Sequence, residues 1–371
     1  MPYYLGAHAM NQTFLLSLVG TSILTNIAKN DPLIRRHANC RDRAEVPATD
    51  VAALDDFVAR AEAALAAASP AEAAILSAEL NTLQKLLGAS PAGQRQHVLI
   101  CTDTWLGSRC AELVRSWLTQ RGDVVELMRV SDLRTTTLEE LQRAFADIAR
   151  WCDEVISGYR DAGYRIVFNL TGGFKGVQGF MQTLAYFYAD ETVYTFEGAE
   201  LMRIPRLPVK ITVDDTVRDN LAAFRRMALG LPVEDAAAAG IAEPLQFVLD
   251  GERCLSSWGE LVWNQSRPAL YGERLWPSPS PRVVFGKAFA ASTGDLNAER
   301  LRILNERLDD AVRFVEAKKS IRRLDLKQLK GSPVPGSTHE FDAWADADTR
   351  RVFCHYEDGA LVLDKLGKAL H

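Results

Sequence analysis

The sequence predicts an α/β protein: a Rossmann-like domain with a mostly parallel sheet, followed by a small α+β domain with an antiparallel sheet. Three observations support this prediction. Short apolar runs alternate with amphipathic stretches up to about residue 225, which is typical of a doubly wound sheet. The C-terminal part instead has three short runs of β-type, two of them joined by Asp358-Gly359, a strong hairpin signal. The length of 371 residues allows two or three domains.

The first domain is expected to span residues 1–225. Its helical stretches repeat apolar residues at the helical spacing, and Gly122 is a typical helix end. We expect strands at 14–20, 97–101, 124–130 and 165–170, and helices in the Ala-rich region 50–88 and at 109–122 and 137–163.

Residues 226–280 are expected to form a Trp-rich segment that connects the domains and packs between them. A bare linker would not contain Trp258, Trp263 and Trp276, because such large apolar side chains are normally buried. The second domain is expected at 281–371. Its predicted elements, in order, are a strand at 283–290, a long helix at 298–321, and strands at 338–344, 350–357 and 360–366.

Composition excludes several classes of protein. No apolar stretch reaches membrane-spanning length, and the first ten residues lack the pattern of a signal peptide, so we expect a cytoplasmic protein with no membrane partner. Six scattered cysteines without a CxxC pair indicate reduced thiols and no metal site. The net charge of −5 argues against general nucleic-acid binding. Residues 318–330 contain six basic residues and one acidic residue, a run that fits a solvated helix face as well as it fits a functional basic patch.

Two loops of the first domain have the chemistry of a phosphate site. In a doubly wound sheet, ligands bind beyond the carboxyl ends of the strands. VGTS (19–22) and LTGGFKG (170–176) both follow predicted strands, and neither matches GxxxxGK[ST] or GxGxxG. Adjacent glycines let a phosphate approach the backbone, while a helix N-terminus and a lysine attract it. For a single loop, the alternative is a tight turn between strand and helix with its lysine in solvent. Two such loops at the same edge of one sheet favour a ligand site. The candidate ligand residues are Thr21, Ser22, Thr171, Gly172, Gly173 and Lys175.

LVGTSILTN (18–26), SAELNTL (77–83) and NLTGGFKG (169–176) resemble the CARF domains of CRISPR-associated proteins. The resemblance extends over about 13–225. CARF domains are Rossmann-like sensors that dimerise and bind cyclic oligoadenylates made by type III CRISPR complexes. The resemblance therefore implies a homodimer whose ligand is lined by the six candidate residues. Cyclic tetraadenylate is the expected activator, although the sequence does not fix the size of the ring.

LKGSP (329–333), THEF (338–341), RRVFCHYEDGALVL (350–363) and KLGK (365–368) resemble the RelE/HigB superfamily of mRNA interferase toxins. This resemblance covers about 282–371. It implies a metal-independent endoribonuclease with no cofactor, in which Arg351 holds the phosphate and Lys330 and Lys368 add positive charge. His339 and Glu340 are then the acid/base candidates. The lysine pair of RelE is replaced by Glu340 and Asp342, and His339 and Lys368 also fit ordinary sheet-edge positions.

Together, the two resemblances imply an antiviral effector that is activated by cyclic oligoadenylate and cleaves mRNA on the ribosome, stopping translation. The expected partners are the cyclic nucleotide, ribosome-bound mRNA, the ribosome and a second copy of the chain, with no DNA. One alternative is a CARF-controlled transcriptional regulator that binds nucleic acid. The strand-rich C-terminal pattern, without helix-turn-helix spacing, argues against it. Another alternative is a ring nuclease that degrades its own ligand, since the same loops would serve both purposes.

Overall fold

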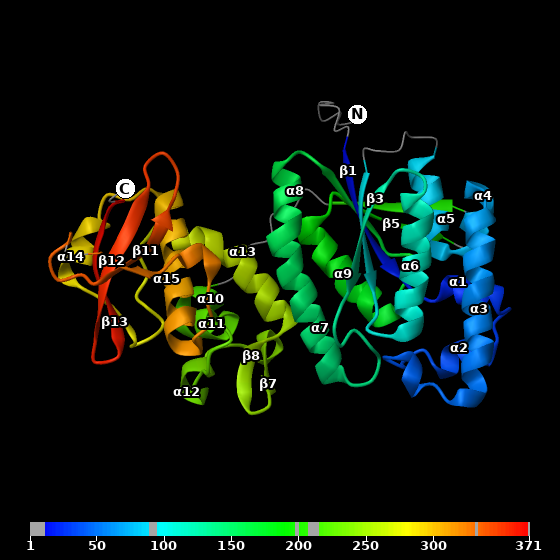
Figure 1. Cartoon of the computed structure of the whole chain (residues 1–371), viewed down its shortest axis with the longest axis horizontal. Coiled ribbons are helices and arrows are strands. Elements are labelled where there is room, and N and C mark those ends of the chain that lie inside the picture. The colour runs from blue at the N-terminus through cyan, green and yellow to red at the C-terminus, as the bar shows by residue number, and fades with distance from the viewer. Residues whose placement is uncertain (1–11, 89–94, 197–199, 207–214, 331–332, 370–371) are drawn as a thin grey trace. The chain divides into compact units, whose positions relative to one another are not determined.

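The computed structural model describes residues 12–88, 95–196, 200–206, 215–330 and 333–369 (Figure 1). The chain forms two compact units, 1–210 and 211–371. This division differs from the sequence boundary at 225, because helix α11 (Leu221–Ala228) runs across that point. Phe224 of α11 is fully buried in a core that contains Trp263, so α11 belongs to the second unit.

Unit 1 is built on a six-stranded sheet with the order β3-β2-β1-β4-β5-β6. The first five strands in this order are parallel, and β6 runs antiparallel to β5. The predicted α/β class and mostly parallel sheet are therefore confirmed. The chain passes outward from β1 to β3 and then returns to the other side of β1, so the strand order reverses between β1 and β4. The strands are β1 (Thr13–Val19), β2 (Arg95–Cys101), β3 (Val124–Arg129), β4 (Arg165–Asn169), β5 (Glu191–Phe196) and β6 (Glu200–Pro205).

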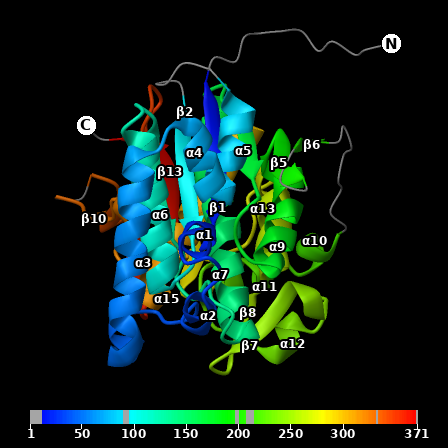
Figure 2. The same ribbon diagram turned by 90° about the vertical axis from the view of Figure 1, so that its right-hand side faces the viewer.

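Helices cover both faces of this sheet (Figure 1). One face packs against α1 (Ser22–Ile27), α3 (Ala48–Ala67), α5 (Ala78–Leu87) and α6 (Trp105–Thr119) around one apolar core. Figure 2 looks onto this side and shows α1, α3 and α4 (Pro70–Leu76) in front of the strands. The other side carries α7 (Leu138–Trp151), α8 (Ser157–Asp161) and α9 (Lys175–Tyr188). A short helix α2 (Pro32–Arg36) follows α1.

The Ala-rich region that was expected to be helical consists of α3, α4 and α5. The breaks between them are set by serine caps. Ser69 and Glu72 form a reciprocal capping box at the start of α4, and the Ser77 hydroxyl accepts the backbone N–H of Leu80 at the start of α5. The second break places Glu79, in the first turn of α5, next to the end of β1.

The Trp-rich segment folds within unit 2. Helix α10 (Thr216–Asp219) and most of α11 precede it, and it contains α12 (Asp235–Ala238), the hairpin β7 (Gln246–Leu249) to β8 (Glu252–Leu255), and α13 (Ser257–Glu273). Trp263 and Trp276 are buried in the core of this segment, whereas Trp258 is 37% exposed. Two of the three tryptophans therefore stabilise unit 2 itself.

A buried charged cluster joins this segment to the rest of unit 2. Arg225 is 1% exposed, and its Nε and Nη2 donate to Asp309 Oδ1 at 2.8 and 2.6 Å. Its Nη1 donates to the carbonyl oxygen of Pro277 at 2.6 Å, and the hydroxyl of Tyr271 donates to Asp309. Asp309 lies on α15 (Ala298–Ala317), so α11, α13 and α15 meet at one ion pair.

The C-terminal strands form a five-stranded sheet with the order β10-β11-β12-β13-β9. Strand β9 is parallel to β13, and the other pairs are antiparallel. At the hairpin, Asp358 and Gly359 both have positive φ, of 47° and 79°, as a tight two-residue turn requires. The strands are β9 (Val283–Phe285), β10 (Lys327–Gln328), β11 (His339–Trp344), β12 (Arg350–Glu357) and β13 (Ala360–Lys368).

The strand predicted at 283–290 is wrong beyond Phe285. Helix α14 (Lys287–Ser292) begins directly after Gly286. A Cβ on Gly286 would lie 2.7 Å from the carbonyl oxygen of Leu363, which accepts the Gly286 N–H. The close approach of β13 therefore ends the strand and turns the chain into the helix.

The two faces of the C-terminal sheet differ. Phe341, Val352, Cys354 and Leu363 pack with residues of α15 in one core. Because successive side chains of a strand point to opposite faces, the residues between them form a second face. We call this second face the polar face; it comprises Glu340, Asp342, Arg351, Phe353, His355, Glu357, Val362, Asp364 and Lys365. Across the described ranges of both units, every helix is too short or too polar to cross a bilayer.

Candidate functional site

The two predicted loops of unit 1 meet where the strand order reverses. Gly20 and Thr21 connect β1 to α1, and Leu170–Phe174 connects β4 to α9. A Cβ on Gly20 would lie 3.1 Å from the backbone nitrogen of Gly173, so the loops are in direct contact. Ligands of doubly wound proteins bind at such a switch point, which makes this the candidate ligand site.

Glu79 fixes the arrangement of the two loops. Its side chain is buried and accepts hydrogen bonds from the Gly20 N–H at 2.8 Å, the Ser22 hydroxyl at 2.8 Å and the Ser77 hydroxyl at 2.7 Å. A Cβ on Gly172 would lie 2.3 Å from Glu79 Oε1 and 2.3 Å from the carbonyl oxygen of Leu18. Internal packing therefore already requires glycine at 172, whereas the sequence had suggested the approach of a ligand as the reason.

The hydroxyl of Thr171 belongs to a threonine cluster. Its Oγ1 lies 2.5 Å from Thr82 Oγ1 and accepts the Thr195 N–H at 3.3 Å. Thr82 Oγ1 is also 2.7 Å from Thr195 Oγ1. Thr171 and Ser22 thus use their hydroxyl groups to link α5, β5 and the two loops. Of the predicted ligand residues, Thr21, Gly173 and Lys175 keep polar groups that make no such internal contact and can bind a ligand.

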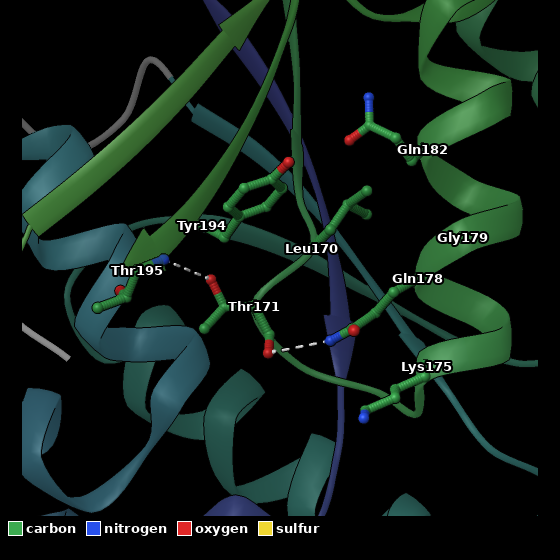
Figure 3. A pocket seen from close by; sticks show the side chains of 8 residues that line it. All are labelled: Leu170, Thr171, Lys175, Gln178, Gly179, Gln182, Tyr194 and Thr195. Carbon is green, nitrogen blue, oxygen red and sulfur yellow. Dashed lines mark hydrogen bonds between the residues drawn. The ribbon is translucent and has the colours of Figure 1, made fainter. Parts of the chain in front are cut away.

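Lys175 is the first residue of α9 and is exposed. It has no ion pair or hydrogen bond among the residues that the structure describes. It lines a cavity of about 460 Å³ together with Thr171, Gln178 and Tyr194 (Figure 3). Burial raises the pKa of Tyr194, which keeps its hydroxyl neutral. A free ammonium group beside an uncapped helix N-terminus favours an anion at this position.

A second cavity of about 210 Å³ also adjoins the loops. It is lined by Thr21 and Gly173 and by residues that the sequence analysis did not select: Gly20, Ala38, Asn39, Thr102, Thr104, Arg134, Thr135 and Phe174. Thr102 and Thr104 follow β2, the neighbour of β1. The sequence could have indicated them, because the loop after β2 ends at the same edge of the sheet as the loop after β1. Arg134 is held by Glu140 at 3.0 Å, and nothing in the sequence placed it beside β1.

In unit 2 the structure brings Arg351 and Glu340 together on the polar face. The guanidinium Nη1 lies 3.1 Å from Glu340 Oε1, and Nη2 lies 2.9 Å from Asp342 and 3.3 Å from Asp325. Lys327, which also pairs with Asp325 at 2.9 Å, lowers the pKa of that carboxyl together with Arg351. Arg351 is therefore neutralised by three carboxylates, an arrangement that opposes the binding of a phosphate.

The other candidates of unit 2 lie elsewhere. Lys368 pairs in register with Arg350, so it points to the face opposite Arg351. His339 pairs with Cys354 of the core face, and its ring contacts Tyr356 edge-on at 5.2 Å between centroids. Lys330 is exposed in the loop after β10. The five predicted catalytic residues thus do not form one cluster.

Residues 74–207 match a family of CRISPR-associated proteins, Cas_APE2256. The match supports a CRISPR-associated protein. It includes Glu79, strands β2 to β6 and the loop from β4 to α9, and it covers none of unit 2. None of the curated proteins matches the chain. Within the described ranges, no group of three or more His, Cys, Asp or Glu side chains is placed to hold a metal ion.

Proposed function

We propose that this protein is an endoribonuclease of a type III CRISPR system that is activated by cyclic oligoadenylate. Unit 1 is the CARF sensor, and unit 2 is a RelE-like nuclease that cleaves mRNA on the ribosome. The observation that carries the proposal is the meeting of the β1 and β4 loops at the switch point, with a free Lys175 at the start of α9. These features lie in or beside the segment that matches a CRISPR-associated family.

A cyclic oligoadenylate suits this site because it is a ring of phosphates. Lys175, the α9 N-terminus and the backbone N–H of Gly173 supply positive potential, and Thr21 supplies a hydroxyl group. A ring with two-fold symmetry would bind across a homodimer, where the same loop of each protomer contacts one half of the ring. Cyclic tetraadenylate is the activator that we expect.

The nuclease assignment is supported by the order of elements in unit 2, a strand and two helices followed by antiparallel strands, as the RelE resemblance implies. Cleavage by such a domain relies on side chains for proton transfer and for stabilising the charge on phosphorus. The three carboxylates around Arg351 are a property of the structure without ligand. For Arg351 to hold a phosphate, it must leave at least part of this cluster.

The proposal is tested by adding cyclic tetra- or hexaadenylate to the full-length protein and measuring both binding and cleavage of RNA. Cleavage is followed on translating ribosomes and on bare RNA. We expect Lys175→Ala to weaken binding about 10- to 150-fold, the effect of losing a charge-assisted hydrogen bond of about 1.5–3 kcal/mol.

Lys85→Ala, in the last turn of α5, is the matched control and should bind like the wild type. Unchanged affinity of Lys175→Ala would contradict the ligand site. Absence of cleavage with either ring, on ribosomes and on bare RNA, would contradict the nuclease.

A further inference from the structure

A histidine–aspartate pair lies on the polar face of the C-terminal sheet. His355 Nδ1 lies 2.9 and 3.1 Å from the two carboxylate oxygens of Asp364. The side chain of His355 is 28% exposed. Its Nε2 has no hydrogen-bond partner among the described residues. A carboxylate at Nδ1 fixes the tautomer and ring orientation of an imidazole, so the second nitrogen is an oriented and accessible proton acceptor.

The position of Asp364 depends on a β-bulge. In the pairing of β12 with β13, Phe353 is opposite Lys365 and Cys354 is opposite Leu363, so Asp364 is the extra residue. Bulges redirect side chains, and they are frequent beside active sites. Asp364 is also held by the buried Ser337, whose hydroxyl donates to Oδ2 at 2.7 Å. Because Ser337 contacts the carboxylate and not the free Nε2, the group is not arranged as a serine nucleophile triad.

A cation accompanies the pair. Lys365 is exposed and opposite Phe353, one position along the same face from His355. It has no ion pair within the described ranges. The charged groups on the same face as His355 are Asp364 and Lys365 on β13 and, on β12, Glu357 two residues away and Arg351 with its carboxylates four residues away. Lys365 is therefore a cation available for a phosphate next to His355, whereas Arg351 is not.

The geometry points to His355 as the general base of RNA cleavage, with Asp364 as its positioning residue and Lys365 as the phosphate-binding cation. This inference rests on the proposed ribonuclease function and names the group that takes the proton. The 2′-hydroxyl gives its proton to His355 Nε2, and the 2′-oxygen forms a bond to phosphorus. The bond from phosphorus to the 5′-oxygen breaks, and water protonates that oxygen. The products are a 2′,3′-cyclic phosphate and a 5′-hydroxyl, and His355 returns its proton to water.

The experiment uses the full-length protein with cyclic tetraadenylate and translating ribosomes. We expect His355→Gln to slow cleavage at least about 100-fold, because a general base typically contributes 10²–10⁴-fold. Glu357→Gln, an exposed position on the same strand, is the matched control and should cleave at the wild-type rate. Binding of the cyclic nucleotide should be unchanged in both variants, which shows that unit 1 is intact.

Two further variants separate the roles. Asp364→Asn should lower kcat of cleavage with KM unchanged, because the ring of His355 loses the carboxylate that orients it, and Asp364→Glu should restore kcat in part, which a merely structural role would not explain. Lys365→Gln should slow cleavage, and Lys365→Arg should restore it in part. If wild-type protein cleaves no RNA, the proposed function fails. If wild-type protein cleaves RNA and His355→Gln matches it, the function stands and this inference is overturned.

Discussion

Two replacements of Glu79 should separate the effect of its charge on the stability of unit 1 from the effect of its hydrogen-bond acceptors. Oε1 accepts the Gly20 N–H, and Oε2 accepts the hydroxyl groups of Ser22 and Ser77. In Glu79→Gln, the amide oxygen can take the place of Oε1, and the amide NH₂ can donate to both hydroxyl oxygens. All three contacts then persist without charge assistance, and we expect a loss of about 1–2 kcal/mol in the free energy of unfolding.

Glu79→Ala removes every acceptor at once. The two hydroxyl groups can rotate, but the Gly20 N–H is fixed by the backbone. A buried donor without an acceptor costs about 1–3 kcal/mol, and the loss of the buried side chain adds a cavity term. We therefore expect a total loss of about 3–5 kcal/mol, clearly larger than for Glu79→Gln.

The assay must report unit 1 alone, because a chain with two compact units need not unfold in one step. Urea denaturation followed by hydrogen exchange of β1 and β4 meets this requirement. The midpoint should fall in the order wild type, Glu79→Gln, Glu79→Ala, with an unchanged denaturant slope. Equal midpoints for the two variants would refute the view that Glu79 holds the loops through its acceptor oxygens.

Two other changes test the interior of unit 1. Gly172→Ala places a methyl group 2.3 Å from two oxygen atoms and should destabilise unit 1 by about 1–3 kcal/mol. Gly158→Ala, with no atom within 4 Å, is the control and should stabilise helix α8 by up to about 1 kcal/mol. Equal urea midpoints for the two variants would contradict the close packing at Gly172. Burial lowers the pKa of His97 to about 3, below its ordinary value of 6.5, so the unfolded chain binds a proton that the folded chain does not as pH falls from 6.5 to 3. Stability should therefore be present above pH 6.5 and decrease by about 1.4 kcal/mol per pH unit below it. Burial raises the pKa of nearby Asp123, so this carboxyl adds stability as pH falls, in the wild type and in His97→Leu alike. His97→Leu should therefore flatten the acid limb of the stability of unit 1. An unchanged limb would refute the assignment to His97.

The alternation of apolar runs and helical stretches was sufficient to predict β1 to β4 of unit 1, of which β1, β2 and β4 are largely buried. It did not predict β5 or the largely exposed β6. The paired loops were also predictable, since the carboxyl ends of parallel strands meet at one edge. Glu79 was not, because its burial depends on how α5 packs beneath β1. A glutamate in the first turn of a helix ordinarily faces solvent.

In unit 2, the DG hairpin was predictable from two residues alone. The surroundings of Arg351 were not, because Asp325, Glu340 and Asp342 come from separate segments that only strand register brings together. His355 shares a face with Arg351 by simple alternation. The bulge that directs Asp364 toward it leaves no mark in the sequence.

The buried Arg225–Asp309 pair sets the smallest fragment of this chain that can be transplanted. A gene fusion that joined residues 281–371 to another domain would leave Asp309 inside the protein without its guanidinium group. Breaking a buried ion pair by removing one partner costs about 3–5 kcal/mol, a large share of the stability of an ordinary domain. Recombination between such proteins should therefore preserve a junction near residue 211, and the C-terminal sheet should be inherited together with the helices and tryptophans that precede it.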